Sequence, residues 1–160
     1  MTVPYRFEPD ATAAELSARF GELDAGAESG AVVTVAGRLM LRREMGKLAF
    51  GTLRDSSGSI QLFAGAKWTD DFPGFVRLSL GDWIGATGEI VKTKTGELSV
   101  KVASWVLLAE ARRGFGDKWR GISDVDTRYR QRYADLWANE ESRETLQLRS
   151  NVVSWIRRWL

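Results

Sequence analysis

Three short stretches decide the fold of this chain: Leu48-Ala-Phe-Gly-Thr-Leu-Arg54, Ser59-Ile-Gln-Leu-Phe-Ala64 and Glu97-Leu-Ser-Val-Lys-Val102. Alternate residues point to opposite faces, the pattern of a β-strand with one face buried. The buried face is predicted to contain Leu53, Ile60, Leu62, Leu98, Val100 and Val102. The opposite face carries Phe50, Gln61 and Glu97, together with Phe63, Ser99 and Lys101. A flat ring, an amide and a carboxylate on one face suit the stacking of an unpaired nucleobase and the binding of its edge.

The strand pattern extends on both sides of these stretches. Strands are predicted at residues 32–43, 48–54, 59–64, 83–91 and 97–108, separated by turns rich in glycine, serine and threonine. Lys67 to Leu80 is long enough for a helical turn, although Pro73-Gly74 argues against a long helix there. The predicted fold class is therefore mainly β: a five-stranded OB-fold Greek-key barrel with a short N-terminal helix and a C-terminal helical extension.

The ends of the chain carry helix signals. Thr12-Ala-Ala-Glu15 has the pattern of a capping box and predicts a short helix that ends near Gly26. Asn139 is placed to cap a final helix, whose apolar end at Leu160 suggests a chain cut from something longer. The predicted organisation is an N-terminal extension at 1–30, the OB-fold domain at 31–111, a hinge or linker at 112–138 and the first helix of a truncated domain at 139–160.

Composition excludes several kinds of chemistry. The chain has no histidine and no cysteine, which rules out Ser–His or Cys–His catalysis, disulfides and the usual zinc sites. We predict no catalytic residue and no metal site. No apolar run approaches the length of a membrane span and no signal segment opens the chain, so we expect a cytoplasmic protein without membrane contact. The net charge is +2, with twelve basic and eight acidic residues in 31–113, a balance that suits a polyanion weakly.

The candidate residues also have ordinary structural interpretations. Phe50 can pack on Phe63 across the sheet, and Gln61 and Glu97 can be solvated polar side chains. The arginine pairs at 42–43 and 112–113 are as consistent with solvated charges as with base contacts. The tryptophans are assigned mainly to packing, with Trp105, Trp155 and Trp159 in a core or interface and Trp119 and Trp137 at the hinge.

Six motifs in order along the chain resemble one family. They are Val35-Ala-Gly-Arg-Leu-Met-Leu-Arg-Arg43, Gly46-Lys-Leu-Ala-Phe50, Leu53-Arg-Asp-Ser-Ser-Gly58, Ile60-Gln-Leu-Phe63, Lys92-Thr-Lys-Thr-Gly-Glu-Leu-Ser-Val100 and Arg128-Tyr-Arg-Gln-Arg-Tyr-Ala-Asp-Leu136. This set is similar to the anticodon-binding OB domain of class II lysyl-tRNA synthetases. The related aspartyl and asparaginyl enzymes share the barrel but usually lack the last two motifs, so lysine is the better assignment.

The resemblance implies roles for particular residues. Phe50 would stack on the central uridine of the anticodon, Gln61 would bind its edge, and Glu97 would accept a hydrogen bond from an anticodon base. Arg38, with Arg42 or Arg43, would contact nearby bases or phosphates. Five further basic residues are candidates for contacts to the RNA backbone: Lys47, Arg54, Lys92, Lys94 and Lys101.

The resemblance also implies what the chain does. We expect a module that binds the anticodon loop of lysine tRNA and needs no cofactor, because the later class II motifs for ATP and lysine are missing. ATP, magnesium and a homodimer are expected only of the complete enzyme, in which the helix at 142–160 would begin the dimer interface. The rival hypotheses are a free-standing OB-fold that binds single-stranded nucleic acid or a protein partner, and the synthetase-like part of a membrane lysyltransferase.

Overall fold

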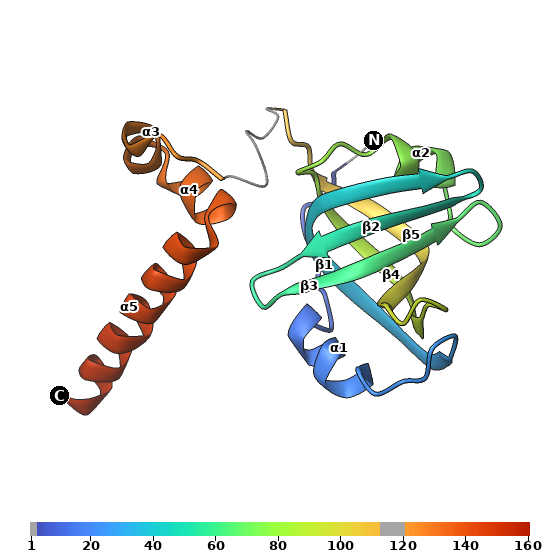
Figure 1. Ribbon diagram of the computed structural model, residues 1–160, viewed down its shortest axis with the longest axis horizontal. Helices are drawn as coiled ribbons and strands as arrows, with labels where there is room; N and C mark the ends of the chain where they lie inside the picture. The colour runs from blue at the N-terminus through green and yellow to red at the C-terminus, as the bar shows by residue number, and fades with distance from the viewer. Residues whose placement is uncertain (1–2, 113–120) are drawn as a thin grey trace. The chain divides into compact units, whose positions relative to one another are not determined.

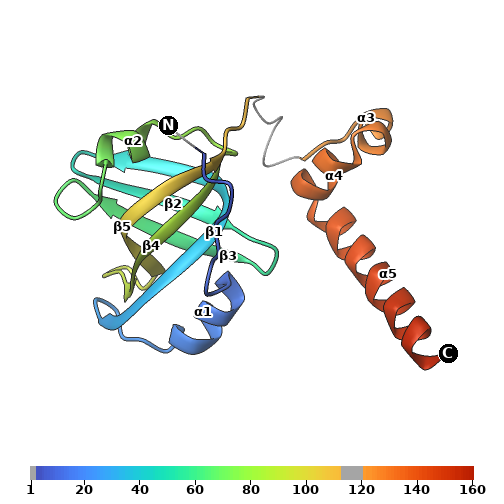
Figure 2. The same ribbon diagram turned by 180° about the vertical axis from the view of Figure 1, so that it is seen from behind.

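A computed structural model describes residues 3–112 and 121–160, which fall into two compact units, Met1–Gly114 and Phe115–Leu160 (Figures 1 and 2). The first unit contains α1 (Ala13–Phe20), β1 (Glu28–Met45), β2 (Leu48–Arg54), β3 (Ser59–Gly65), α2 (Phe72–Arg77), β4 (Trp83–Lys92) and β5 (Leu98–Ala109). The second unit contains α3 (Val125–Arg130), α4 (Arg132–Ala138) and α5 (Glu140–Trp159). Of the predicted hinge or linker at 112–138, residues 113–120, with Trp119, lie outside the described residues, and the described remainder contains α3 and α4.

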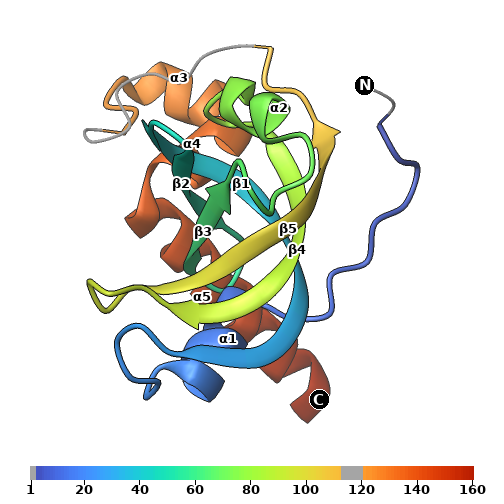
Figure 3. The same cartoon turned by 90° about the vertical axis from the view of Figure 1, so that its right-hand side faces the viewer.

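The five strands form one sheet that closes into a barrel in the order β1-β2-β3-β5-β4, with β4 paired back on β1. Four of the pairings are antiparallel, and only β3 and β5 run parallel. The chain passes through α2 between β3 and β4, and α1 and α2 lie at opposite ends of the barrel (Figures 1 and 3). The predicted five-stranded OB-fold with helices at both ends of the chain is confirmed.

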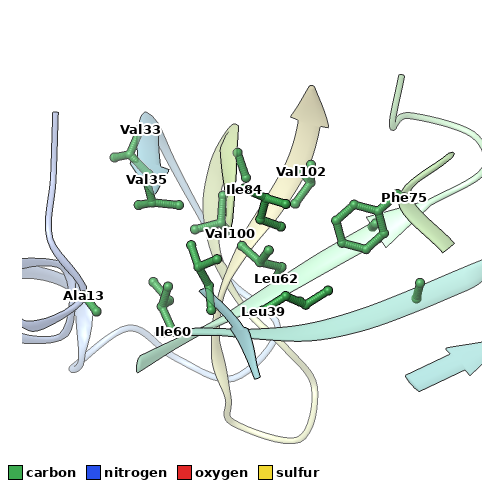
Figure 4. Close-up of a cluster of buried hydrophobic side chains, with 14 of the residues drawn as sticks. Ala13, Val33, Val35, Leu39, Ile60, Leu62, Phe75, Ile84, Val100 and Val102 are labelled. Atoms are coloured by element: carbon green, nitrogen blue, oxygen red, sulfur yellow. The ribbon is translucent and has the colours of Figure 1, made fainter. Parts of the chain in front are cut away.

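The core lies inside the barrel and follows the predicted alternation. Leu62, Val100 and Val102 are completely buried, and they meet Leu39 and Ile84 from β1 and β4 (Figure 4). Burial of one such side chain contributes about 1.5–3 kcal/mol. Leu98 is only partly buried against this core.

Strand bounds agree closely with the prediction, and the differences have local causes. β2 has the predicted bounds, whereas β1 begins earlier, at Glu28, which pairs with Val91 of β4. β5 begins at Leu98, because Glu97 belongs to the preceding turn, where its N–H donates to Thr93 Oγ1 at 3.0 Å.

The N-terminal helix is shorter than predicted and is tied to the barrel at both ends. The capping box is present, but α1 ends at Phe20, with Gly21 and not Gly26 at the C-cap. Lys92 Nζ donates to the Gly21 carbonyl at 2.8 Å and satisfies this helix end. Gly26, with a φ of 86°, instead turns the chain into β1.

At the start of α1, the carboxylate of Asp55 fastens the helix to the β2–β3 turn. Asp55 Oδ2 accepts from Ala13 N at 2.7 Å, and Oδ1 accepts from Ser57 N at 2.7 Å and Gly58 N at 2.9 Å. Burial alone raises the pKa of Asp55, but these hydrogen bonds outweigh it and hold the pKa below its ordinary value. The N-terminal extension is therefore fixed to the turn between two strands of the candidate site.

The short helix α2 closes one end of the barrel. Pro73 lies in its first turn, where its missing N–H costs nothing, so it begins this helix rather than breaking it. Phe75 is completely buried beneath the barrel end, and its ring lies edge-on to Trp105 at a centroid distance of 6.0 Å. Trp105 is therefore a packing residue, as predicted.

The second unit is organised around one buried carboxylate. Asp135 accepts from Arg128 Nε at 2.8 Å and Arg132 Nη1 at 2.7 Å, and from Asn139 Nδ2 at 2.6 Å. Asn139 occupies the N-cap position of α5 as predicted, but its side chain makes no cap hydrogen bond. It binds the backbone of Ile122 instead, through Nδ2–H to the carbonyl at 3.0 Å and Oδ1 from the amide at 3.1 Å.

Candidate nucleic-acid interface

The outer face of β1, β2 and β3 carries the candidate residues in cross-strand rows. In the first row, Arg43 pairs with Phe50, Phe50 with Phe63, and Phe63 with Lys101 of β5. In the second row, Thr52 pairs with Gln61 and Gln61 with Ser99. In the third row, Arg38 pairs with Arg54 and Arg54 with Ser59. We refer to the solvent-facing residues of these three rows as the outer face; Ser99 belongs to the second row by register but is buried.

An aromatic stack crosses the first row. The rings of Phe50 and Phe63 are nearly parallel, with an interplanar angle of 8° and a centroid distance of 5.0 Å. Trp68 follows β3 and meets Phe63 edge-on at 5.2 Å. Phe63 thus covers one face of the Phe50 ring, so a base that stacks on Phe50 must use the opposite face, on the side of β1. Phe50 therefore packs on Phe63 as its structural interpretation predicts, and its ring stays partly exposed.

Gln61 is held from one side. Its Nε2 donates to Ser99 Oγ at 2.9 Å, and Ser99 Oγ donates to the backbone carbonyl of Glu97 at 3.2 Å. Ser99 was expected on the exposed face, but its side chain is completely buried because Gln61 lies over it. The hydroxyl therefore joins the strand that carries the amide to the turn that carries the carboxylate.

Glu97 lies in the β4–β5 turn with an exposed side chain. The turn is fixed by its own backbone, since Thr93 N donates to the Glu97 carbonyl at 2.9 Å and Gly96 N to the Thr93 carbonyl at 2.8 Å. Gly96 has a φ of 85°, which favours glycine at this position. A carboxylate on a fixed turn can accept a hydrogen bond from a base without a large ordering cost.

The three arginines of β1 have different environments because of a bulge between Leu39 and Leu41. The bulge puts Arg43 in register with Phe50 and turns Arg42 away, where its Nη1 donates to the carbonyls of Val76 and Leu78 at the end of α2. Arg42 therefore does not join the outer face. Arg43 is the exposed one of the pair and lies beside the open side of the Phe50 ring.

Arg38 lies at the far end of the outer face, with its guanidinium carbon 5.4 Å from the centre of the Trp83 ring. Partial burial lowers the pKa of Arg38, but an arginine stays charged at neutral pH. Its neighbour Arg54 is half-buried on β2. The two guanidinium groups give this end of the face two positive charges.

The candidate lysines divide into engaged and exposed side chains. Lys92 binds the end of α1, and Lys101 Nζ lies 2.7 Å from Glu28 Oε1 in an ion pair. Lys101 is also 5.8 Å from the centre of the Trp68 ring. Lys47 and Lys94 are exposed in the β1–β2 and β4–β5 turns. Phosphate contacts would be made most easily by these two turn lysines.

Sequence reasoning did not single out Trp68 and Trp83. Trp83 begins β4 with its side chain 40% exposed, before the buried Ile84, so the alternation of the strand was an available signal. Trp68 lies in the loop after β3, and no periodicity places its ring on Phe63. Within residues 3–112 and 121–160, no cluster of acidic side chains could hold a metal ion. Across the same described residues, no helix is long and apolar enough to span a membrane.

Comparison with known proteins agrees with this geometry. The family model for the tRNA anticodon type of OB-fold nucleic acid binding domain matches residues 33–108. The chain is 48% identical over 162 residues to a lysine–tRNA ligase from Synechococcus sp. (strain RCC307), covering 99% of this chain and 32% of the relative. It is 46% identical over 170 residues to a lysine–tRNA ligase from Prochlorococcus marinus (strain MIT 9313), covering 98% of this chain and 34% of the relative. The chain spans about a third of the length of the curated relatives it matches.

Proposed function

We propose that this chain, whose residues 33–108 belong to the tRNA anticodon type of OB-fold nucleic acid binding domains, binds the anticodon loop of lysine tRNA. The chain is homologous to the N-terminal third of lysine–tRNA ligases, and its proposed task is the recognition step of such a ligase. The attachment of lysine with ATP and magnesium, a homodimer and a cytoplasmic location belong to the same proposal for the complete protein.

The observation that carries the proposal is the adjacency of Phe50 and Gln61 on the outer face. The two side chains occupy neighbouring rows of β2 and β3, which lie about 7 Å apart along the strands. An unpaired base or two neighbouring bases bound on this face can therefore meet both a ring to stack on and an amide that binds a base edge. Stacking contributes about 1–3 kcal/mol per base and is indifferent to sequence, whereas the amide distinguishes donors from acceptors.

Charge completes the proposed site. Arg43 borders the open face of the Phe50 ring, and Lys47 and Lys94 extend from the two turns beside the outer face. These side chains are suited to phosphate contacts, which strengthen binding to any RNA and weaken as salt is added. Glu97 supports selectivity, since a carboxylate repels phosphate but accepts hydrogen bonds from a base.

Binding to two stem-loops tests the proposal. One carries the lysine anticodon and the other differs only by cytidine at the central uridine, and both are measured at one fixed salt concentration. We expect the cytidine copy to bind about tenfold more weakly, because charge contacts do not sense this change. Phe50→Ala should weaken binding to the uridine copy by a similar factor, whereas Val32→Ala, a change at an exposed β1 residue outside the three rows, should not. Equal binding of both stem-loops by the unchanged chain would refute base readout on this face.

A further inference from the structure

We infer that Ser99 sets the base specificity of the outer face by fixing which end of the Gln61 amide is presented to RNA. Ser99 is completely buried, so it does not touch the ligand and acts only through its neighbours. The inference rests on the proposed function and goes beyond it, because it assigns the preference for uridine to a residue outside the contact surface.

The hydrogen-bond geometry carries the argument. A serine hydroxyl has one proton, and in this structure the proton of Ser99 goes to the backbone carbonyl of Glu97 at 3.2 Å. Ser99 Oγ is then an acceptor toward Gln61, and the amide must turn its NH2 group to it, as the Nε2 to Oγ distance of 2.9 Å shows. The opposite amide orientation would either bring two oxygen lone pairs together or remove the Ser99 hydrogen bond from the Glu97 carbonyl, which would keep its bonds from Thr93 N and Thr93 Oγ1. Because the Ser99 hydroxyl is buried, no water molecule can bind there to compensate for the unfavourable contact or the lost hydrogen bond.

The fixed amide leaves Gln61 Oε1 as the atom available to a base. In the described part of the chain, no donor binds this oxygen. An amide oxygen accepts the N3–H of uracil, whereas cytosine has an unprotonated nitrogen at that position. Cytosine N3 would oppose one acceptor with another, and its N4 amino group could donate to Oε1 only if the base shifted, which would leave N3 without a donor.

The same hydroxyl also ties the two base-reading positions together. The Glu97 carbonyl that receives the Ser99 proton also accepts from Thr93 N at 2.9 Å, so it belongs to the backbone of the fixed β4–β5 turn. Ser99 thereby connects the amide on β3 to the turn that carries the Glu97 carboxylate. This is the role of a positioning residue, which shapes the site without entering it.

Ser99→Ala is the variant that tests the inference, with Ser104→Ala as its matched control. Ser104 lies on the same strand, but its partner is Thr87 of β4 and it is remote from Gln61. We measure the affinity for the uridine and cytidine stem-loops and take their ratio. The unchanged chain and Ser104→Ala should prefer uridine by about tenfold. Ser99→Ala should bring the ratio close to one, because an unrestrained amide can rotate and offer its NH2 to cytosine N3. Unchanged discrimination in Ser99→Ala would overturn the inference.

A double-mutant cycle separates this role from a general structural one. In a Gln61→Ala background, Ser99→Ala should not alter the uridine-to-cytidine ratio further, because there is no amide left to orient. An equal loss of affinity for both stem-loops, with the ratio preserved, would show that Ser99 only stabilises the barrel and would contradict the inference. If the unchanged chain fails to discriminate, the proposed function itself fails, and the two failures are thus distinguishable.

NMR of the unchanged chain keeps the inference testable even if Ser99→Ala does not fold. The side-chain NH2 protons of Gln61 should show nuclear Overhauser contacts to the β-protons of Ser99, and their exchange with water should be slower than that of Gln131 in the second unit. The side chain of Gln131 is exposed. Rapid exchange and the absence of these contacts would show a freely rotating amide and would overturn the inference.

Discussion

The barrel and the helical unit of this chain are stabilised by opposite means. The barrel buries a continuous apolar core that includes Leu62, Val100 and Phe75. In the described residues of the helical unit, the buried residue is a carboxylate, Asp135, and the apolar side chains of α5 remain exposed: Leu148, Val152, Trp155, Ile156 and Trp159. An apolar core contributes stabilising free energy over its whole buried area. A polar centre, here Asp135 and its hydrogen-bond partners, depends on the charge and geometry of a few atoms. The barrel should therefore tolerate changes of pH and salt that disturb the helical unit.

The largest expected effect is on the barrel core. Leu62→Ala should destabilise the barrel by about 2–5 kcal/mol, because it removes completely buried methyl groups and leaves a cavity. Leu148→Ala is the matched change in the helical unit, where the side chain is 65% exposed, and it should have little effect. The free energy of unfolding of each variant can be measured by urea titration, with NMR signals that report on the two units separately. A large loss from Leu148→Ala would show that the exposed face of α5 is covered in solution.

Replacement of the polar centre should affect only the helical unit. Asp135→Asn removes the charge that faces Arg128 and Arg132, and it should cost about 2 kcal/mol at neutral pH, with the barrel unaffected. The loss of stability can be measured by thermal unfolding followed by circular dichroism at 222 nm, a wavelength at which helices dominate the signal.

The pH dependence of the helical unit gives a second test of Asp135. Burial raises the pKa of Asp135, but hydrogen bonds from Arg128, Asn139 and Ser142 outweigh it and lower the pKa below its ordinary value. Because the folded pKa is depressed, the stabilisation is fully present above about pH 4 and is lost as the pH falls through the folded value. The Asn variant should lack this acid-dependent loss. Identical acid titrations of the two proteins would contradict the assignment.

The barrel also contains a carboxylate, Asp55, that holds a helix in place. Asp55→Ala removes the acceptor for Ala13 N, the first amide of α1, and should cost about 1–2 kcal/mol, a typical loss for a helix cap. The loss should be local, so that amide hydrogen exchange becomes faster in α1 while the exchange of core strands changes little. Uniform loss of protection across the barrel would indicate that α1 is part of the cooperative core.

The smallest expected effect distinguishes two neighbouring lysines. Lys94→Ala should weaken stem-loop binding by less than about 1 kcal/mol and reduce its salt dependence, since the side chain is exposed in the turn. Lys92→Ala should leave the salt dependence unchanged and instead loosen α1, because Lys92 Nζ binds the Gly21 carbonyl. The slope of log Kd against log salt measures the difference, and equal slopes for both variants would contradict it.

The sequence predicted most reliably where a local pattern determines the structure. Strict alternation determined the bounds of β2 and the buried positions of β3, and the capping box located the start of α1. These features need only neighbours in the chain. The placement of Phe50 and Gln61 on one face followed from the same alternation, once the two strands pair as a hairpin.

The rest of the site depended on contacts between distant residues. The bulge that separates Arg42 from Arg43 arises from pairing with β2, and no local signal chooses between two adjacent arginines. Lys92 is engaged because the end of α1 happens to lie near it in space. The burial of Ser99 follows from the parallel pairing of β3 and β5, which joins segments far apart in the sequence. Alternation predicts the face of a residue but not what covers it.

The closed strand order has a consequence for the partners that this barrel can accept. In the described barrel every strand has a neighbour on each side, since β4 pairs with both β5 and β1. A sheet with an open edge can capture an extended peptide by adding it as a further strand, and it is prone to the same reaction with copies of itself. Strand segments that pair with a single neighbour remain in the described barrel, among them the end of β1 after Arg38 and the end of β5 after Lys101. Where the strands are paired on both sides, a ligand of the outer face is contacted through side chains, which suits bases and phosphates better than an extended backbone.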